Sequence, residues 1–176
     1  MRIGILICAL LLASCAKQEP QQQKLTSGKD EQQIEEMISQ FYKGMERVYN
    51  EGVVNSDSLL SSAYDPAVHY VTPWGWTEPL DTTKARLRRA YGRVKNYSHH
   101  LEIVDIKSYG DVAYAFFTLR QEYTVDGRLL EEYLPTTVIL ERKGDGWKIV
   151  HAHRSTDYET MQQYVAQQQP RTSKKK

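Results

Sequence analysis

The spacing of apolar residues changes once along this 176-residue chain, and the change fixes the order of its secondary structure. Between residues 31 and 94, apolar side chains mostly recur every three or four positions, as in amphipathic helices. After residue 99 they alternate with polar ones, as in strands with one buried face. Helices followed by consecutive strands predict an α+β fold, with the N-terminal helices packed on one face of a curved antiparallel sheet.

The individual elements follow from these periods and from turn residues. The first part is predicted to contain a helix over 31–51 that Gly52 ends, a helix over 57–64, a strand over 67–72, a loop over 73–81 and a helix from Asp81 or Thr82 to about Val94. Four strands follow, over 99–109, 111–125, 129–142 and 147–155. Their connections contain Gly-Asp, Asp-Gly and Gly-Asp-Gly, which are typical of hairpins.

The N-terminal sequence MRIGILICALLLASC has one basic residue, a short apolar run and a small-residue ending before a cysteine. The ending Leu-Ala-Ser-Cys resembles the lipobox of bacterial lipoproteins. We therefore predict a signal peptide over 1–14, a lipidated Cys15 that opens a flexible tether over 15–30, a domain over 31–164 and a polar basic tail over 165–176. An ordinary cleaved signal followed by a chance cysteine is the alternative.

Processing at Cys15 settles the charge and the thiols of the mature chain. Removal of residues 1–14 takes away Arg2 and no acidic residue, which leaves 22 basic and 22 acidic residues. This balance gives no electrostatic basis for binding nucleic acid. Cys8 leaves with the signal and Cys15 carries the lipid, so no thiol remains for a disulfide or a metal. In a Gram-negative bacterium, Ala16 after the lipidated cysteine predicts the outer membrane, with the domain facing the periplasm.

Two segments, GDVAYAFFTLRQEYTVDGR and TTVILERKGDGWKIVHAHRS, together with the order of elements, resemble the nuclear transport factor two-like (NTF2-like) superfamily and its SnoaL-like branch. The last strand also resembles the end of the hub domain of calcium/calmodulin-dependent kinase. The resemblance covers about residues 31–158. It implies a cone-shaped α+β barrel, a pocket between sheet and helices, and a homodimer formed through the sheet. It does not imply one chemistry.

Two arginines are the leading candidates for that pocket. The resemblance to the kinase hub domain implies that Arg120 and Arg154 are basic pocket residues, which would receive a carboxylate or phosphate. Strict alternation puts Arg154 on one face of the last strand and Trp147, Ile149, His151 and His153 on the other. A bulge in this strand would exchange the faces. Pairing of both arginines with local acids such as Glu122, Glu131 or Glu132 is the alternative.

Aromatic residues complete the predicted ligand site. Tyr114 and Phe116 share the face of Arg120 in their strand, and Tyr42, Trp74 and Trp76 fall where the first helix and the loop would rim the cone. Such a cavity suits an unknown small molecule with a carboxylate or an aromatic body. His151 and His153 form a possible metal pair with a third ligand from His69, His99 or His100, but no carboxylate has a suitable spacing. We therefore predict no metal and no cofactor.

The sequence does not identify a catalytic residue. Asp65, His69, His99, Asp105 and Tyr114 are candidates for acid–base chemistry, and no neighbouring residue distinguishes one of them. No nucleophile elbow, metalloprotease helix or phosphate-binding glycine loop is present in the sequence. A membrane-anchored ligand-binding domain is therefore the leading prediction, and an isomerase, cyclase or hydratase and a dimeric interaction module are the alternatives.

Overall fold

A computed structural model describes residues 28–52 and 55–168. Its elements are α1 (Gly28–Asn50), α2 (Ser56–Ala63), β1 (Tyr64–Val71), β2 (Thr77–Glu78), α3 (Leu80–Ala90), β3 (Val94–Tyr109), β4 (Val112–Val125), β5 (Arg128–Lys143), β6 (Gly146–Arg154) and α4 (Tyr158–Gln168). The predicted signal peptide, the lipidated Cys15, most of the tether and the end of the tail lie outside the described residues. No described helix is long and apolar enough to span a membrane.

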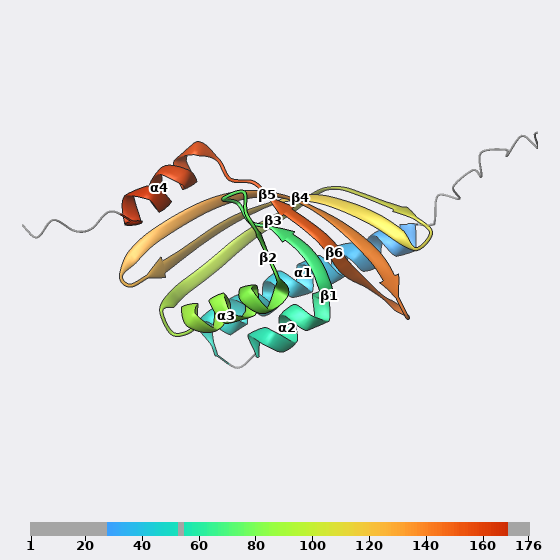
Figure 1. The fold of residues 1–176 in the computed structure, drawn as a ribbon, viewed down its shortest axis with the longest axis horizontal. Helices are drawn as coiled ribbons and strands as arrows, with labels where there is room; N and C mark the ends of the chain where they lie inside the picture. The colour runs from blue at the N-terminus through green and yellow to red at the C-terminus, as the bar shows by residue number, and fades with distance from the viewer. Residues whose placement is uncertain (1–27, 53–54, 169–176) are drawn as a thin grey trace, which may run out of the picture.

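Six strands form one curved sheet in the order β2-β1-β6-β5-β4-β3, which arches over α1, α2 and α3 (Figure 1). Strands β3 to β6 form the predicted antiparallel meander. β1 pairs with β6 in parallel, so the sheet is mixed and not antiparallel throughout. The α+β class is confirmed. The described sheet is cone-like but open, because β2 and β3 are its two edges and do not pair with each other.

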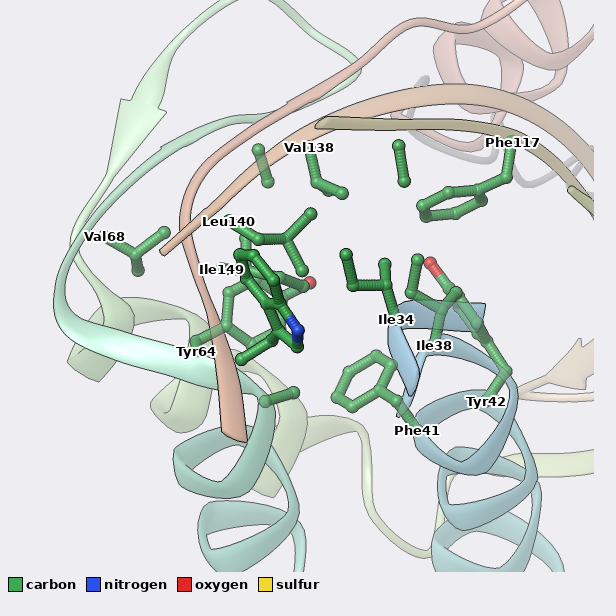
Figure 2. Packing of buried hydrophobic residues seen from close by; sticks show 14 of the residues in the cluster. Ile34, Ile38, Phe41, Tyr42, Tyr64, Val68, Phe117, Val138, Leu140 and Ile149 are labelled. Atoms are coloured by element: carbon green, nitrogen blue, oxygen red, sulfur yellow. The ribbon is translucent and has the colours of Figure 1, made fainter. Parts of the chain in front are cut away.

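Helix α1 provides the packing layer under the sheet. Ile34, Ile38 and Phe41 follow one another at helical spacing and are buried in the same cluster as Val138 of β5 (Figure 2). Each fully buried side chain of this kind contributes about 1.5–3 kcal/mol. α1 begins three residues earlier than predicted, so the last predicted tether residues are helical. Asp30 in its first turn forms an ion pair with Arg142, whose Nη2 lies 2.8 Å from Oδ1.

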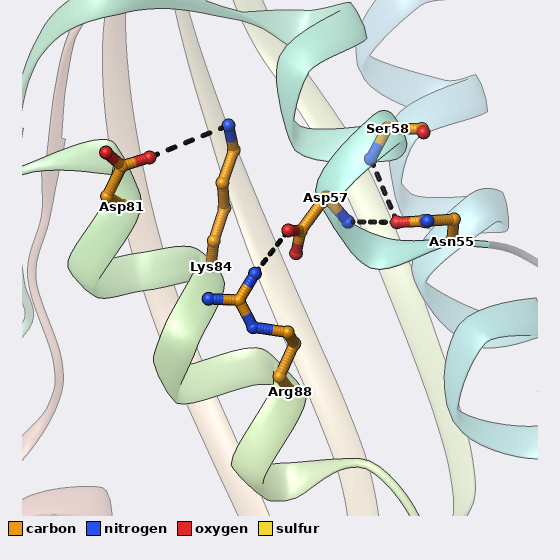
Figure 3. A network of polar contacts seen from close by, with 6 residues as sticks. All are labelled: Asn55, Asp57, Ser58, Asp81, Lys84 and Arg88. Carbon is orange, nitrogen blue, oxygen red and sulfur yellow. Dashed lines mark hydrogen bonds and ion pairs between the residues drawn. The ribbon is translucent and has the colours of Figure 1, made fainter.

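Polar contacts hold α3 beside α2 (Figure 3). Asn55 caps α2, because its Oδ1 accepts hydrogen bonds from the backbone N–H of Asp57 at 2.8 Å and of Ser58 at 3.2 Å. Asp57 in turn forms an ion pair with Arg88 of α3. These contacts orient α3 so that Leu87 is buried and lines the cavity described below.

The ends of α3 differ from the prediction. The helix starts at Leu80 after Pro79, which provides no side-chain cap, instead of after Asp81 or Thr82. It ends four residues early, before Gly92, whose φ of 79° lies in the left-handed region that favours glycine. Tyr91, the residue that follows the helix, is 54% exposed.

Strand β6 contains a β-bulge that resets its two faces. Leu140 of β5 pairs with Ile149, but the preceding residue of β5, Ile139, pairs with His151, so Val150 is one extra residue. The inner face of β6 therefore carries Trp147, Ile149, Ala152 and Arg154. The prediction that Trp147 and Ile149 share a face with the two histidines is wrong, since the bulge lies between the two pairs. His151 and His153 face the outer side of the sheet, where His153 is exposed.

Helix α4 was not predicted, and its residues were assigned partly to the domain and partly to the tail. It lies along the part of β5 that extends beyond the end of β6. Thr160 Oγ1 accepts a hydrogen bond from the backbone N–H of Tyr133 at 3.2 Å, and Gln163 Oε1 accepts one from that of Glu131 at 3.4 Å. α4 thus covers an edge whose backbone donors would otherwise be unpaired.

Candidate functional site

A cavity of about 370 Å³ lies between the inner face of the sheet and the helices. The ends of β3, β4 and β5 near Val94, Val125 and Leu130, together with Arg154 at the end of β6, form its floor. Aromatic and aliphatic side chains from α1, α3 and the β1–β2 hairpin form the other walls, and Thr160 and Gln163 of α4 close one side. A largely apolar cavity of this size with a few polar groups is typical of small-molecule sites.

Arg154 is the cation at one end of this cavity. Its Nη2 donates a hydrogen bond to the Tyr42 hydroxyl at 2.6 Å, and the guanidinium carbon lies 5.9 Å from the Tyr42 ring and 5.8 Å from the Tyr70 ring. Its Nε is buried and has no hydrogen-bond partner. No carboxylate of the described residues lies within ion-pair distance of Arg154. The arginine therefore presents a charge that the surrounding protein does not neutralise.

The tyrosines around Arg154 are neutral hydrogen-bonding groups. Burial raises the pKa of the Tyr42 hydroxyl, and the positive charge of Arg154 offsets only part of this effect. Burial also raises the pKa of Tyr49 to about 12. Burial acts to lower the pKa of Arg154, but nearby tyrosine oxygens, above all that of Tyr42, keep it well above its usual value. At physiological pH the cavity thus combines a fixed cation with uncharged phenols.

A second arginine in the cavity wall is neutralised within the protein. Arg86 of α3 lies with its Nη2 2.7 Å from Oε1 of Glu78 in β2, and the same oxygen accepts a hydrogen bond from Thr83 at 2.7 Å. The Arg86 side chain is 47% exposed, whereas that of Glu78 is 8% exposed. This pair fastens β2 to α3, and so it fixes the hairpin that carries Trp74 and Trp76.

The far end of the cavity carries a row of polar side chains across β3, β4 and β5. The Tyr97 hydroxyl donates to Oε1 of Gln121 at 3.0 Å, and Gln121 Nε2 donates to Glu132. The Tyr123 hydroxyl donates to the other oxygen of Glu132 at 3.0 Å. No lysine or arginine in the described part of the chain pairs with Glu132. Its carboxylate accepts two hydrogen bonds but has no countercharge.

The structure divides the predicted ligand residues between two faces. Tyr42, Trp74, Trp76 and Arg154 line the cavity. Arg120, Tyr114 and Phe116 do not, because the inner face of β4 belongs to the opposite row, Ala113, Ala115, Phe117 and Leu119, which is buried. Arg120 is exposed on the outer face, where its guanidinium carbon lies 4.5 Å from the Tyr133 ring. The prediction that the latter three residues face the pocket is wrong.

The predicted acid–base candidates lie outside the cavity. Asp65 caps a local turn, since its Oδ1 accepts a hydrogen bond from the backbone of Ala67, and His69 is exposed. Asp105 accepts a hydrogen bond at 2.5 Å from Tyr114 on the outer face. His99 lies beside the cavity with Nδ1 3.0 Å from Glu46 Oε2, although this contact is not aligned as a hydrogen bond.

The described residues contain no group of three or more His, Cys, Asp or Glu side chains placed to hold a metal ion. His151 and His69 are partners across β6 and β1, but His153 and His69 are exposed to solvent on the outer side.

Sequence reasoning did not identify Glu132 as a cavity residue and mentioned it only as a partner for arginine. The signal that identifies it is the buried even-numbered row of β5, which includes Leu130, Leu134 and Val138. Glu132 interrupts this apolar row, and a charged residue among buried positions points to a role in a site. Tyr97 and Gln121 carry no comparable signal.

The fold is shared with several solved structures of low sequence identity. A conserved protein from Planctomyces limnophilus is 17% identical, with 74% of this chain and 98% of that chain covered and a TM-score of 0.63. A putative dehydratase of the NTF2-like family from Streptomyces avermitilis is 21% identical, over 74% and 99% of the two chains, with a TM-score of 0.61. The CaMKII hub of S. rosetta is 17% identical, over 76% and 100%, with a TM-score of 0.61.

These similarities show that the chain has an NTF2-like fold. The model of the SnoaL-like domain matches residues 36–166, most of the chain. The chain therefore belongs to the SnoaL-like family, as its sequence motifs predicted. Comparison with curated protein sequences finds no match.

Proposed function

We propose that this chain is a membrane-anchored binding protein for a small molecule that carries a carboxylate on an apolar or aromatic body. The observation that carries the proposal is Arg154, a partly buried guanidinium that faces the cavity without a carboxylate partner. Tyr42 and Tyr70 lie against it, so a bound acid would meet a charged donor and neutral phenols together. The aromatic walls would cover the rest of the ligand.

The energetics of the Arg154 charge support an anionic ligand. A charge removed from water without a partner destabilises the folded protein by several kcal/mol, and a bound carboxylate would offset that cost. The Arg86–Glu78 pair shows how the same cavity wall neutralises a charge when its role is structural. Arg154 lacks such a partner among the described residues, which favours an exogenous one.

An acid–base enzyme is the alternative function. One solved structure with this fold is of a putative dehydratase, and another is of a ketosteroid isomerase-like protein. The acid–base candidates from the sequence lie outside the cavity, which favours binding over catalysis by those residues. Glu132 is a carboxylate inside the cavity, and it is the residue through which an enzymatic function would be tested.

The binding proposal is tested with a matched pair of probes, biphenyl carboxylate and biphenyl carboxamide. The two have the same shape, but only the first carries the charge that Arg154 would pair with. Isothermal titration of the purified full chain should give at least about tenfold tighter binding for the carboxylate. Equal affinities, or no binding of either probe, would overturn the proposal.

The membrane anchor is proposed from Cys15 and the apolar run before it. In this proposal the lipid holds the domain at the periplasmic side of a bacterial outer membrane. A Cys15→Ala variant should lose incorporation of a labelled fatty acid and leave the membrane fraction or stay unprocessed. Unchanged labelling in that variant would remove the anchor from the proposal without affecting the cavity.

A homodimer is proposed through the outer face of the sheet. Val104 of β3 and Ile139 of β5 are 52% and 40% exposed there, and Phe116 of β4 lies beside them in the sheet. Exposed apolar side chains grouped on one sheet face are typical of self-complementary interfaces. Native mass spectrometry should give the mass of two chains, and Ile139→Glu should give one. A monomeric wild-type mass at high concentration would contradict the dimer.

A further inference from the structure

Arg154 and Glu132 are charged cavity residues without an ion-pair partner among the described residues, and they stand well apart along the cavity. Arg154 pairs with Thr136 across the sheet, and Glu132 lies four residues before Thr136 on β5. At about 3.4 Å per residue along a strand and 4.8 Å between strands, their backbones are about 14 Å apart. Both side chains line the same cavity, yet they do not form an ion pair. The protein thus holds a cation and an anion apart on one wall.

The surroundings of Glu132 suit a cation. The Tyr97 and Tyr123 rings, whose hydroxyls donate to the polar row, lie stacked with centroids 6.2 Å apart, and the Tyr49 ring lies 5.2 Å from that of Tyr97. Aromatic faces beside a carboxylate are a common means of recognising alkylammonium groups, because ring quadrupole and carboxylate charge both attract the cation. At the other end, the donors around Arg154 are suited to an anion.

The wall between the two ends is apolar. Leu134 lies between Glu132 and Thr136 on the inner face of β5, and it is buried. On α1, Met45 lies between Tyr42, which contacts Arg154, and Tyr49, which contacts Tyr97. A ligand that reaches both ends must therefore have an apolar middle.

We infer that the ligand is an amino acid in the broad chemical sense, with a carboxylate at one end, an apolar or aromatic spacer and a protonated amine at the other. The inference rests on the proposed function, because it keeps the carboxylate on Arg154. It adds an ammonium site, in which the protonated amine binds to Glu132 and against the rings of Tyr97 and Tyr123.

The test uses a biphenyl carboxylate that carries an aminomethyl group on the far ring, and its ethyl isostere, which has the same shape without the charge. Isothermal titration of the full chain should show the aminomethyl acid binding about tenfold tighter than the ethyl acid. Glu132→Gln should abolish this preference while the ethyl acid keeps its affinity. Glu122→Gln makes the same charge change on the outer face and should leave the preference intact.

The outcomes separate this inference from the proposed function. If both acids bind with equal affinity and the binding of both depends on Arg154, the ammonium site at Glu132 is overturned and the carboxylate site at Arg154 stands. If the preference for the amine persists in Glu132→Gln, Glu132 is not its partner and the inference fails. If neither acid binds the wild-type chain, or if binding is independent of Arg154, the proposed function fails as well.

Discussion

Two arginines on the inner face of the sheet, near its opposite ends, are surrounded in opposite ways. Arg142 places Nη2 2.8 Å from Asp30 and Nε 3.3 Å from Asp111, and its guanidinium carbon lies 4.3 Å from the Trp147 ring. Arg154 has phenols and aromatic rings around it but no carboxylate among the described residues. One end of the sheet neutralises its cation within the protein, and the other end does not.

This difference separates a structural role from a binding role for the same residue type. Arg142 ties the first turn of α1 to β5, so its ion pair with Asp30 stabilises the layer that covers the sheet. Arg154 ends β6 above a cavity, where a partner from the chain itself would fill the space that a ligand needs. Variants of the two arginines should therefore change different measurements.

The largest expected effect is on binding by Arg154→Met. Methionine fills similar apolar volume but removes a charged hydrogen bond of about 1.5–3 kcal/mol, so a biphenyl carboxylate should bind about ten- to a hundredfold more weakly. The unfolding free energy should not fall, because the variant removes a charge that has no carboxylate partner. Arg120→Met, on the outer face, is the matched control and should leave binding unchanged. A large loss of stability without a change in affinity would make Arg154 structural instead.

Arg142→Met should show the reverse. It removes a partly buried ion pair and an aromatic contact, and it leaves Asp30 without a partner, so we expect a loss of about 1–2 kcal/mol in unfolding free energy. Urea denaturation measures this loss, and carboxylate affinity below the transition should stay within about twofold of wild type. A loss of affinity as large as that of Arg154→Met would remove the distinction between the two ends.

Arg154→Lys should give a smaller effect on binding than Arg154→Met. Lysine keeps the charge but loses the planar fork that holds a carboxylate with two bonds, so a reduction of about fivefold in carboxylate affinity is expected.

His153→Ala tests the face assignment of β6, because His153 is exposed on the outer side and its loss should not alter the titration. If His153→Ala abolishes binding and Arg154→Met does not, the faces of β6 are inverted.

The smallest expected effect is that of pH. Burial raises the pKa of Tyr42 and raises that of Tyr49 to about 12, and the pKa of Arg154 stays above its usual value, so these three cavity groups keep their charge between pH 6 and about pH 10. A carboxylate ligand with an ordinary pKa of about 4 is ionised over that whole range. Affinity should be flat there and fall only as the ligand is protonated. A step near pH 9 would show a titrating tyrosine.

The order of elements was predictable because it follows from local periods and turns. The Asp126-Gly127 hairpin is an example, since both residues have positive φ, 50° and 77°, as a two-residue turn requires. The end of α1 was predicted within two residues from Gly52, whose φ is 69°. Helix α4 was missed because its sequence has little apolar periodicity and it is held by side chains on the edge of β5.

The site was predictable only in part, because alternation gives two faces without saying which is inner. For β4 the row with Ala113, Ala115 and Phe117 is the more apolar one, and that comparison would have placed Arg120 outside. For β6 no such comparison was sufficient, since an extra residue at Val150 changes the face within the strand. Arg154 was placed on the pocket face from the sequence, but Trp147 and Ile149, which share that face in the structure, were placed on the opposite one.

The bulge at Val150 has a consequence for comparing this chain with its relatives. Deleting Val150 would restore a regular strand in which Trp147, Ile149, Ala152 and Arg154 still point the same way. Loss of one residue at this position therefore leaves the same side chains of β6 on its inner face. A sequence alignment across β6 then needs a one-residue gap inside a strand, where gaps are normally penalised. An ungapped alignment with a relative that lacks the extra residue would place His153 in the column of the arginine and misassign the residue that faces the ligand.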